Sequence, residues 1–253
     1  MPTLDVRFGS YVFGNEIDTL EIENESRVNQ AAVPRRNGLL SDEAYAGGLR
    51  IRIGGLIGGV GEDADDVRST LNSLKNAFNQ GKQLLRIWND REVEAQKSYF
   101  MARIGEGGDM TTIEWEAELV ADEPVFRSVN ETEQEETITS SPETNTFANN
   151  GNADAPVVIR ITAGSSTIAS GLRIDNETTG EYFTINEEIA IDDWIEIDTD
   201  LLTVVDQDGT NKISVFAQDF FKLAAGDNSV KWTGTATGSP KIKITYRDRY
   251  DGF

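Results

Sequence analysis

The sequence predicts a mainly β protein with one long helix, divided into two domains. Short runs of β-branched and aromatic residues recur between Gly, Asn and Asp turns, and one segment, residues 62–81, carries a clear helical apolar pattern. Between residues 133 and 152 the chain is acidic and almost free of apolar side chains. We therefore expect an N-terminal domain at 1–132, an acidic linker or exposed loop at 133–152, and a C-terminal domain at 153–253.

The N-terminal domain begins with strand signals. Residues 4–14, LDVRFGSYVFG, mix aromatic and β-branched side chains and end in Gly-Asn, which predicts a strand followed by a turn. Residues 33–48 contain a proline and several glycines, so we expect an extended, exposed loop there. Residues 49–53, LRIRI, then alternate apolar and charged side chains, as a strand with one buried face does.

The segment at residues 62–81, EDADDVRSTLNSLKNAFNQG, predicts an amphipathic helix. Acidic residues crowd its first turn, where the helix dipole favours them, and Gly81 can end it. Its apolar stripe follows i, i+4, i+7, i+11 spacing and consists of Val67, Leu71, Leu74 and Phe78. We interpret this stripe as core against a sheet rather than as a partner-binding face.

Further strands follow the helix. Residues 83–107 predict a strand, a turn at Asn89-Asp90 and returning strands, and residues 111–124, TTIEWEAELVADEP, alternate most cleanly of all. The polar side of this last strand carries Glu114, Glu116 and Glu118, opposite Ile113, Trp115, Ala117 and Leu119. The three glutamates could line an acidic channel, or they could be an ordinary solvated sheet face.

From residue 153 onward, strand follows strand without a convincing helix, which predicts an antiparallel β-sandwich. Residues 192–211, DDWIEIDTDLLTVVDQDGTN, are the most acidic part of it. Asp208-Gly209 between apolar runs is a hairpin-turn signal, whereas Asp206-x-Asp208-Gly209 only begins a calcium-loop pattern. We therefore interpret these carboxylates as a turn and a wet face, not as a metal site.

Composition excludes most enzyme chemistry. The chain has no cysteine and no histidine, which removes thiol nucleophiles, imidazole zinc sites and every Ser/His/Asp mechanism. A paired-carboxylate glycosidase is the main enzyme class that survives. The net charge of −21 disfavours tight nucleic-acid binding, although an acidic wall could still repel DNA that slides past it. No run of about 18 apolar residues and no signal peptide is visible.

The order of several motifs resembles one protein family. AVPRRNGLLSDEAYAGGLRIRIGGLIGG, then DDVRSTLNSLKNAFNQG, then KQLLRIWNDREVEAQ resemble the N-terminal domain of the distal tail proteins of siphophages infecting Gram-positive bacteria. SGLRIDNETTGEYFTINEEIAIDDWIEIDTDLLTVVDQDGTNK and FFKLAAGDNSVKWTG are similar to the C-terminal domain of that family. The resemblance runs through almost the whole chain.

This resemblance implies a structural protein of the virion, made in the host cytoplasm and placed at the distal end of the phage tail. The implied fold is a tail-tube-like β-sandwich or barrel with a packed helix, followed by a galectin-like or carbohydrate-module-like sandwich. The implied assembly is a homo-hexameric ring that joins the tail tube protein to the tail-tip hub or tail-associated fibre protein and, in many phages, to receptor-binding proteins. DNA would pass through the lumen without specific binding. We expect no enzymatic activity, no cofactor and no metal.

Site residues follow as expectations. Glu114, Glu116 and Glu118 would form an acidic lumen face, and Arg35 and Arg36 of the exposed loop would contact a subunit or the tube. The alternative function is a carbohydrate-binding adhesion module for the host cell surface, in which Trp194 and Trp232 would stack on a sugar if they are exposed, although we favour a buried core position for both. Galectin-type sites use a histidine that this chain lacks. A glycosidase ranks third, because 44 acidic residues single out no catalytic pair.

Overall fold

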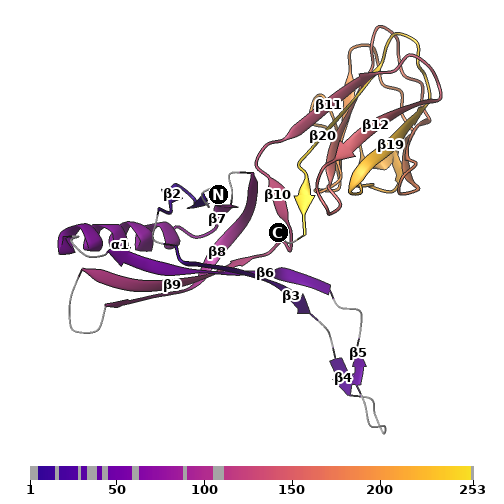
Figure 1. The fold of residues 1–253 in the computed structure, drawn as a ribbon. Coiled ribbons are helices and arrows are strands. Elements are labelled where there is room, and N and C mark those ends of the chain that lie inside the picture. Colours follow the sequence, from indigo (N-terminus) through magenta and orange to yellow (C-terminus); the bar gives the residue numbers. More distant parts are fainter. Residues whose placement is uncertain are drawn as a thin grey trace. The chain divides into compact units, whose positions relative to one another are not determined.

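The structure is a computed structural model, and it describes residues 5–14, 17–27, 30–32, 39–41, 45–58, 63–87, 90–104 and 111–251. It is mostly β with antiparallel sheets and one α-helix in the described ranges, which confirms the predicted fold class (Figure 1). The chain divides into two compact units. Unit 1 comprises residues 1–129 and 251–253, and unit 2 comprises residues 130–250. No described helix is long and apolar enough to cross a membrane.

Unit 1 is built on an open antiparallel sheet. Its strands are β1 (Val6–Phe8), β2 (Tyr11–Val12), β3 (Thr19–Arg27), β6 (Tyr45–Gly58), β7 (Gln83–Ile87), β8 (Arg91–Ile104), β9 (Thr112–Ala121) and β10 (Phe126–Ser128). They follow the order β2-β1-β7-β8-β9-β6-β3, with β10 beside β8. Two further strands, β4 (Gln30–Ala32) and β5 (Leu39–Ser41), pair separately. The expected sandwich or barrel is wrong for this unit, because the end strands β2 and β3 do not pair and the sheet stays open.

Helix α1 (Ala64–Phe78) lies along one face of this sheet (Figure 1). The Asp63 carboxylate accepts the Asp65 backbone N–H at 3.1 Å and so caps the first turn, where acidic side chains also suit the dipole. Three residues of the predicted stripe, Val67, Leu74 and Phe78, are buried in the core, and the fourth, Leu71, is partly exposed. The Phe78 ring lies 6.1 Å from that of Trp115 on β9, centroid to centroid, so the helix and the sheet share one aromatic core.

The alternation predicted for β6 and β9 is also observed. Leu49, Ile51 and Ile53 are buried, and β9 buries Ile113, Trp115, Ala117 and Leu119 on the same face. The register between the two strands is unbroken from Leu49↔Ala121 to Gly58↔Thr112. A one-residue slip would turn the apolar set to solvent, so burial under α1 fixes this register.

Unit 2 is a sandwich of two antiparallel sheets. The first has the order β11-β20-β13-β16-β17, and the second β12-β19-β14-β15-β18. The elements are β11 (Thr132–Thr137), β12 (Glu143–Asn149), β13 (Val157–Thr162), β14 (Leu172–Asn176), β15 (Glu181–Ile185), β16 (Trp194–Asp198), β17 (Thr203–Asp206), η1 (Ile213–Val215), β18 (Phe216–Gln218), β19 (Gly226–Thr233), β20 (Lys241–Tyr246) and β21 (Arg249–Tyr250). One continuous core of aliphatic and aromatic residues fills the space between the sheets.

The expected linker at 133–152 is wrong in its conformation. Most of it is β11 and β12, the edge strands of the two sheets of unit 2, and the chain enters this unit at residue 130. The polar composition of the segment predicted a linker, but edge strands also need few buried side chains and often carry charges, so the same composition is compatible with a strand. Phe147 on β12 and Ile138 between the two strands are buried in the core, and they are the two strong apolar signals in the segment.

The turn that joins β11 to β12 is organised by one carboxylate. Glu143 accepts hydrogen bonds from the backbone N–H groups of Thr139 (2.7 Å) and Ser140 (2.9 Å) and from both hydroxyls. These bonds, led by the one from the Thr139 N–H, favour the ionised form and lower the pKa of Glu143 from 4.5 to about 2.

We predict that Glu143→Gln destabilises unit 2 in a pH-dependent way. The folded-state pKa lies below the unfolded value, so the stabilisation is fully present above pH 4.5 and is lost as the pH falls toward 2. Because solvent reaches the side chain, we expect a loss of about 1 kcal/mol at pH 7. Urea unfolding at pH 7 and pH 3 measures it, with the exposed Glu188→Gln as the control for charge. A loss of equal size at both pH values would contradict the assigned role.

Candidate functional site

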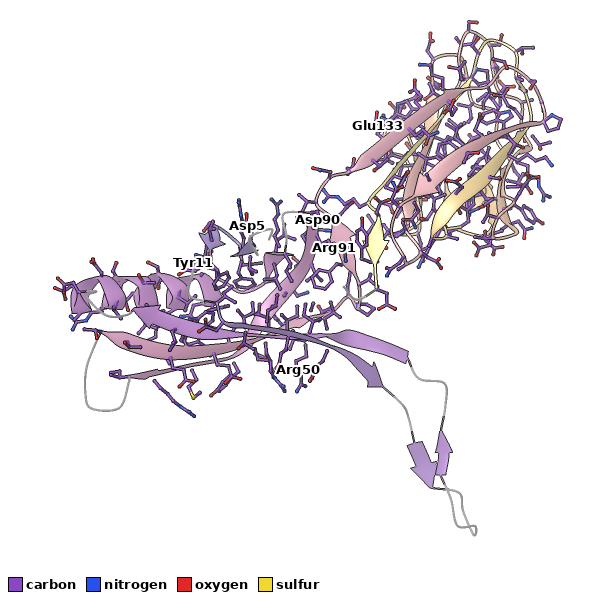
Figure 2. All side chains as sticks on the ribbon, viewed as in Figure 1. Asp5, Tyr11, Arg50, Asp90, Arg91 and Glu133 are labelled. Atoms are coloured by element: carbon purple, nitrogen blue, oxygen red, sulfur yellow. The ribbon has the colours of Figure 1, made fainter. Side chains whose placement is uncertain are left out.

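The three predicted glutamates lie on the face of the unit 1 sheet that points away from α1. Glu114 and Glu116 are exposed and Glu118 is partly exposed, while their neighbours on β9 are buried beneath the helix. Arg50 on β6 projects to this outer side as well (Figure 2). The alternation of side chains that buries one set of residues in the core therefore also places the charged residues together on the opposite face of the sheet.

Register places other charged residues beside the glutamates. On β6, Arg52 lies opposite Glu118, and on β8, Arg103 lies opposite Glu114. On β3, Glu21 and Glu23 lie opposite Arg52 and Arg50. We name this set the charged face, and it consists of Glu21, Glu23, Arg50, Arg52, Arg103, Glu114, Glu116 and Glu118.

The charged face is not uniformly acidic. Glu118 lies 3.5 Å from Arg52 and 3.9 Å from Arg50, and the Ser98 hydroxyl donates to its Oε1 at 2.8 Å. Arg52 also lies 3.8 Å from Glu21. Glu118 is thus largely neutralised by its neighbours, whereas Glu114 and Glu116 form no ion pair with another described residue. The acidic character of the face is concentrated at these two positions.

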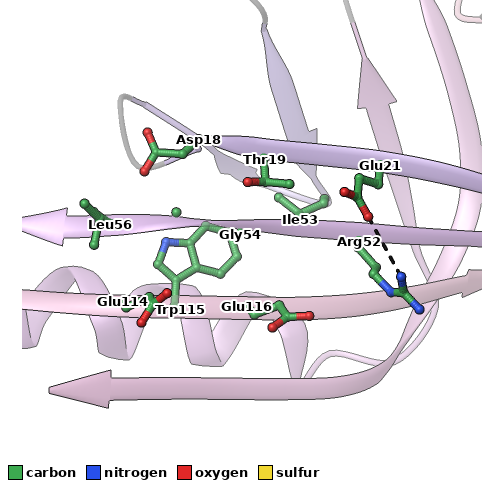
Figure 3. A pocket seen from close by; sticks show the side chains of 11 residues that line it. Asp18, Thr19, Glu21, Arg52, Ile53, Gly54, Leu56, Glu114, Trp115 and Glu116 are labelled. Carbon is green, nitrogen blue, oxygen red and sulfur yellow. Dashed lines mark ion pairs between the residues drawn. The ribbon is translucent and has the colours of Figure 1, made fainter. Parts of the chain in front are cut away.

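Glu114 and Glu116 line an open hollow of about 490 Å³ on this face. Its wall also includes Asp18 and Glu21, with Arg52 at one end, and Gly54 leaves its floor without a side chain (Figure 3). A Cβ at Gly54 would lie 3.1 Å from the Trp115 carbonyl oxygen, so the close approach of β9 favours glycine. Carboxylates dominate the hollow, yet the described part of the chain contains no cluster of three or more side chains able to hold a metal ion.

The two candidate sugar-stacking tryptophans have different environments. Trp232 is buried in the core of unit 2 and its indole Nε1–H donates to the Thr235 carbonyl at 3.2 Å, so it does not meet the condition of exposure under which it would stack on a sugar. Trp194 is partly exposed, but the Arg160 guanidinium lies 4.3 Å from its ring centroid and is itself bonded to Glu196 at 2.6 Å. One face of Trp194 is therefore already covered by a cation.

The acidic stretch at 192–211 forms the strands β16 and β17 and a tight turn. The Asp206 carboxylate accepts the backbone N–H groups of Thr210 (2.9 Å) and Asp208 (3.0 Å), and the first of these bonds is the main cause of its lowered pKa. Gly209 has φ +76°, as the predicted Asp-Gly turn requires. The carboxylate of Asp206 thus serves the backbone of its own loop.

Sequence reasoning found part of this arrangement. It placed the three glutamates on one face but missed Arg50 and Arg52 as their partners, although the LRIRI alternation carried that signal. It gave no signal for the hollow at Gly54 or for Arg160 over Trp194, because both depend on which strands are neighbours. Arg35 and Arg36 lie outside the described residues.

Comparison with known proteins identifies a family whose model matches part of the chain. Residues 150–250 match the family described as siphovirus-type tail component, C-terminal domain. Comparison with curated proteins gave no match.

The fold of the whole chain is similar to that of a solved tail protein. The Dit protein of phage SPP1, described as a paradigm of the hub adsorption apparatus in phages that infect Gram-positive bacteria, matches with a TM-score of 0.71 and 12% identity over 98% of this chain and 99% of that one. The baseplate of phage P2 in its calcium-activated conformation covers 95% of this chain and 90% of that one at 11% identity, but its TM-score of 0.35 carries no argument. The family match and the fold agree with the resemblance to siphophage distal tail proteins, and together they support a structural role in a phage tail or baseplate.

Proposed function

We propose that this distal tail protein forms a homo-hexameric ring that joins the tail tube to the tail-tip hub and surrounds a channel for DNA. The observation that carries the proposal is the correspondence of the whole chain, both units included, with the hub protein of phage SPP1. The partners are the tail tube protein, the hub or tail-associated fibre protein and, in some phages, receptor-binding proteins. No catalytic step is part of this role.

The charge of the chain supports a path for DNA without adhesion. Its net charge is −21, and phosphate contacts need clustered Lys and Arg. On the charged face, Arg50 and Arg52 already have carboxylate partners, and Glu114 and Glu116 outnumber the remaining cation, Arg103, so a passing phosphate would meet a net negative surface. We propose that this face lines the lumen, with Glu118 as a neutralised neighbour. Such a wall repels the DNA backbone rather than retaining it.

The first prediction of the ring is a mass. We expect light scattering across a concentration series to give about 167 kDa, six times the 27.9 kDa of one chain. Because subunit association is concentration-dependent, the series should extend down to dilutions at which a weak ring would dissociate. The ring would be contradicted if the protein is a monomer at every concentration and also stays a monomer when purified tail tubes are added.

The lumen assignment predicts an effect on DNA release. We expect the triple variant Glu114→Lys, Glu116→Lys, Glu118→Lys to slow DNA release from otherwise intact virions about tenfold or more, because a ring of added lysines binds phosphates. Receptor-triggered release, followed by a DNA-binding dye, measures it at low and high salt, and salt should reduce the defect. The matched control reverses three exposed acids of unit 2, Glu188, Asp219 and Asp227, to Lys. Equal release by the two variants would remove these glutamates from the lumen.

The alternative role as an adhesion module receives less support. Trp232 is unavailable in the core, and Arg160 covers one face of Trp194, so neither predicted stacking ring presents two free faces. We expect no saturable binding in a calorimetric titration of the protein with cell-wall polysaccharide of the host. Saturable binding that Trp194→Ala abolishes and Trp194→Phe retains would instead favour a carbohydrate-binding function. Measured hydrolysis of the polysaccharide by the protein would be needed to support a glycosidase function.

A further inference from the structure

Strand β11 is attached to unit 2 in an unusual way. Its sequence, TEQEET, contains no apolar residue, and none of its six side chains is buried. The other three edge strands of the sandwich each anchor an apolar side chain in or against the core, namely Phe147 on β12, Val204 on β17 and Phe216 on β18. Burial of apolar surface therefore contributes little to holding β11.

Backbone pairing and surface ion pairs hold β11 to β20. The register runs from Thr132↔Tyr246 to Thr137↔Lys241. Three ion pairs reinforce it, Glu135 with Lys241 (2.6 Å), Glu133 with Lys243 (3.0 Å) and Glu131 with Arg247 (3.9 Å). The three glutamate side chains are about half exposed, at 44%, 58% and 55%, and Figure 2 shows Glu133 on the outside of the strand. Exposed pairs of this kind are weak and are screened by salt.

The core beside β11 is closed by other groups. The Tyr246 hydroxyl on β20 donates to the Ala148 carbonyl on β12 at 2.6 Å, which ties the two sheets together directly. Immediately after β11, Ile138 is buried and its N–H donates to the Pro240 carbonyl at 2.8 Å. Only Gln134, which donates to the Thr146 carbonyl at 2.9 Å, links β11 itself to the other sheet. Separation of β11 can therefore stop at Ile138 and leave the sandwich closed.

We propose that β11 is a releasable strand that exchanges between a sheet-bound state and a free connector. Unit 2 begins at residue 130, so release up to Ile138 converts residues 130–137 into a flexible segment with a reach of about 26 Å. Ionic strength shifts the balance, because salt screens the ion pairs that reinforce the backbone pairing of β11 with β20. This property belongs to the single chain and does not depend on the ring.

Hydrogen exchange of the full-length protein, followed by mass spectrometry, tests this directly. The natural control is β12, which is also an edge strand but buries Phe147. We expect the amides of β11 to exchange about tenfold or more faster than those of β12, and the ratio to grow between 50 mM and 500 mM salt as screening weakens the ion pairs.

Two sets of variants separate release from general instability. The double variant Glu133→Lys, Glu135→Lys places like charges beside Lys241 and Lys243. We expect the amides of β11 to exchange faster than in the unmodified protein, and the exchange rates of β12 to stay unchanged. Adding Lys241→Glu and Lys243→Glu should restore protection. Because the chain has no cysteine, Glu135→Cys with Lys243→Cys, two residues directly opposite in the register, gives a unique disulfide that should abolish the fast exchange until it is reduced.

Each outcome decides the proposal. Fast, salt-dependent exchange that the disulfide suppresses supports a releasable strand. Protection of β11 equal to that of β12 at both salt concentrations overturns it. Failure to form a hexamer would bear only on the ring, since exchange in β11 is measured on the chain whatever its assembly state.

Discussion

The packing of α1 against one face of the unit 1 sheet is the constraint on which much of this molecule depends. Phe78 and Trp115 share a core in which Phe13 also stacks on Trp115 at 5.8 Å. Because side chains alternate along a strand, burying one set of residues on β6 and β9 commits the intervening set to the opposite face. The charged face is thus a consequence of the core. Its glutamates and arginines meet because their strands are neighbours, and their positions cannot shift without moving apolar residues out from under the helix.

The two sheets of unit 2 stay open rather than closing into a barrel, and charged side chains protect their exposed edge strands. An open sandwich leaves strands whose outer backbone groups are unpaired, and charges on such strands discourage association with other chains. On β11 this solution has been carried so far that the strand has no apolar contact of its own. Because charged and polar residues take the place of apolar ones on this edge, the attachment of β11 depends on backbone pairing and surface ion pairs rather than on burial.

A role in the tail agrees with what the chain lacks as well as with what it contains. Its sequence contains no histidine and no cysteine, and its most strongly perturbed carboxylates, Glu143 and Asp206, bind the backbone of their own turns. Groups used in this way stabilise loops and are not available for proton transfer. The charged face and the two units instead offer surfaces, which is what a structural component of a phage tail needs.

The sequence by itself determined the β-rich class, the single helix with its buried stripe, the alternation of β6 and β9 and the Asp-Gly turn, because each of these follows from periodicity or local turn chemistry. Order among the motifs also led to the distal tail family. Tertiary structure alone decided that most of residues 133–152 pair as strands, that the first sheet stays open, that Arg50 and Arg52 neutralise Glu118 and that Arg160 covers one face of Trp194. The physical reason is common to all four. Each depends on which strands become neighbours, and pairing between residues far apart in the chain leaves no trace in local sequence pattern.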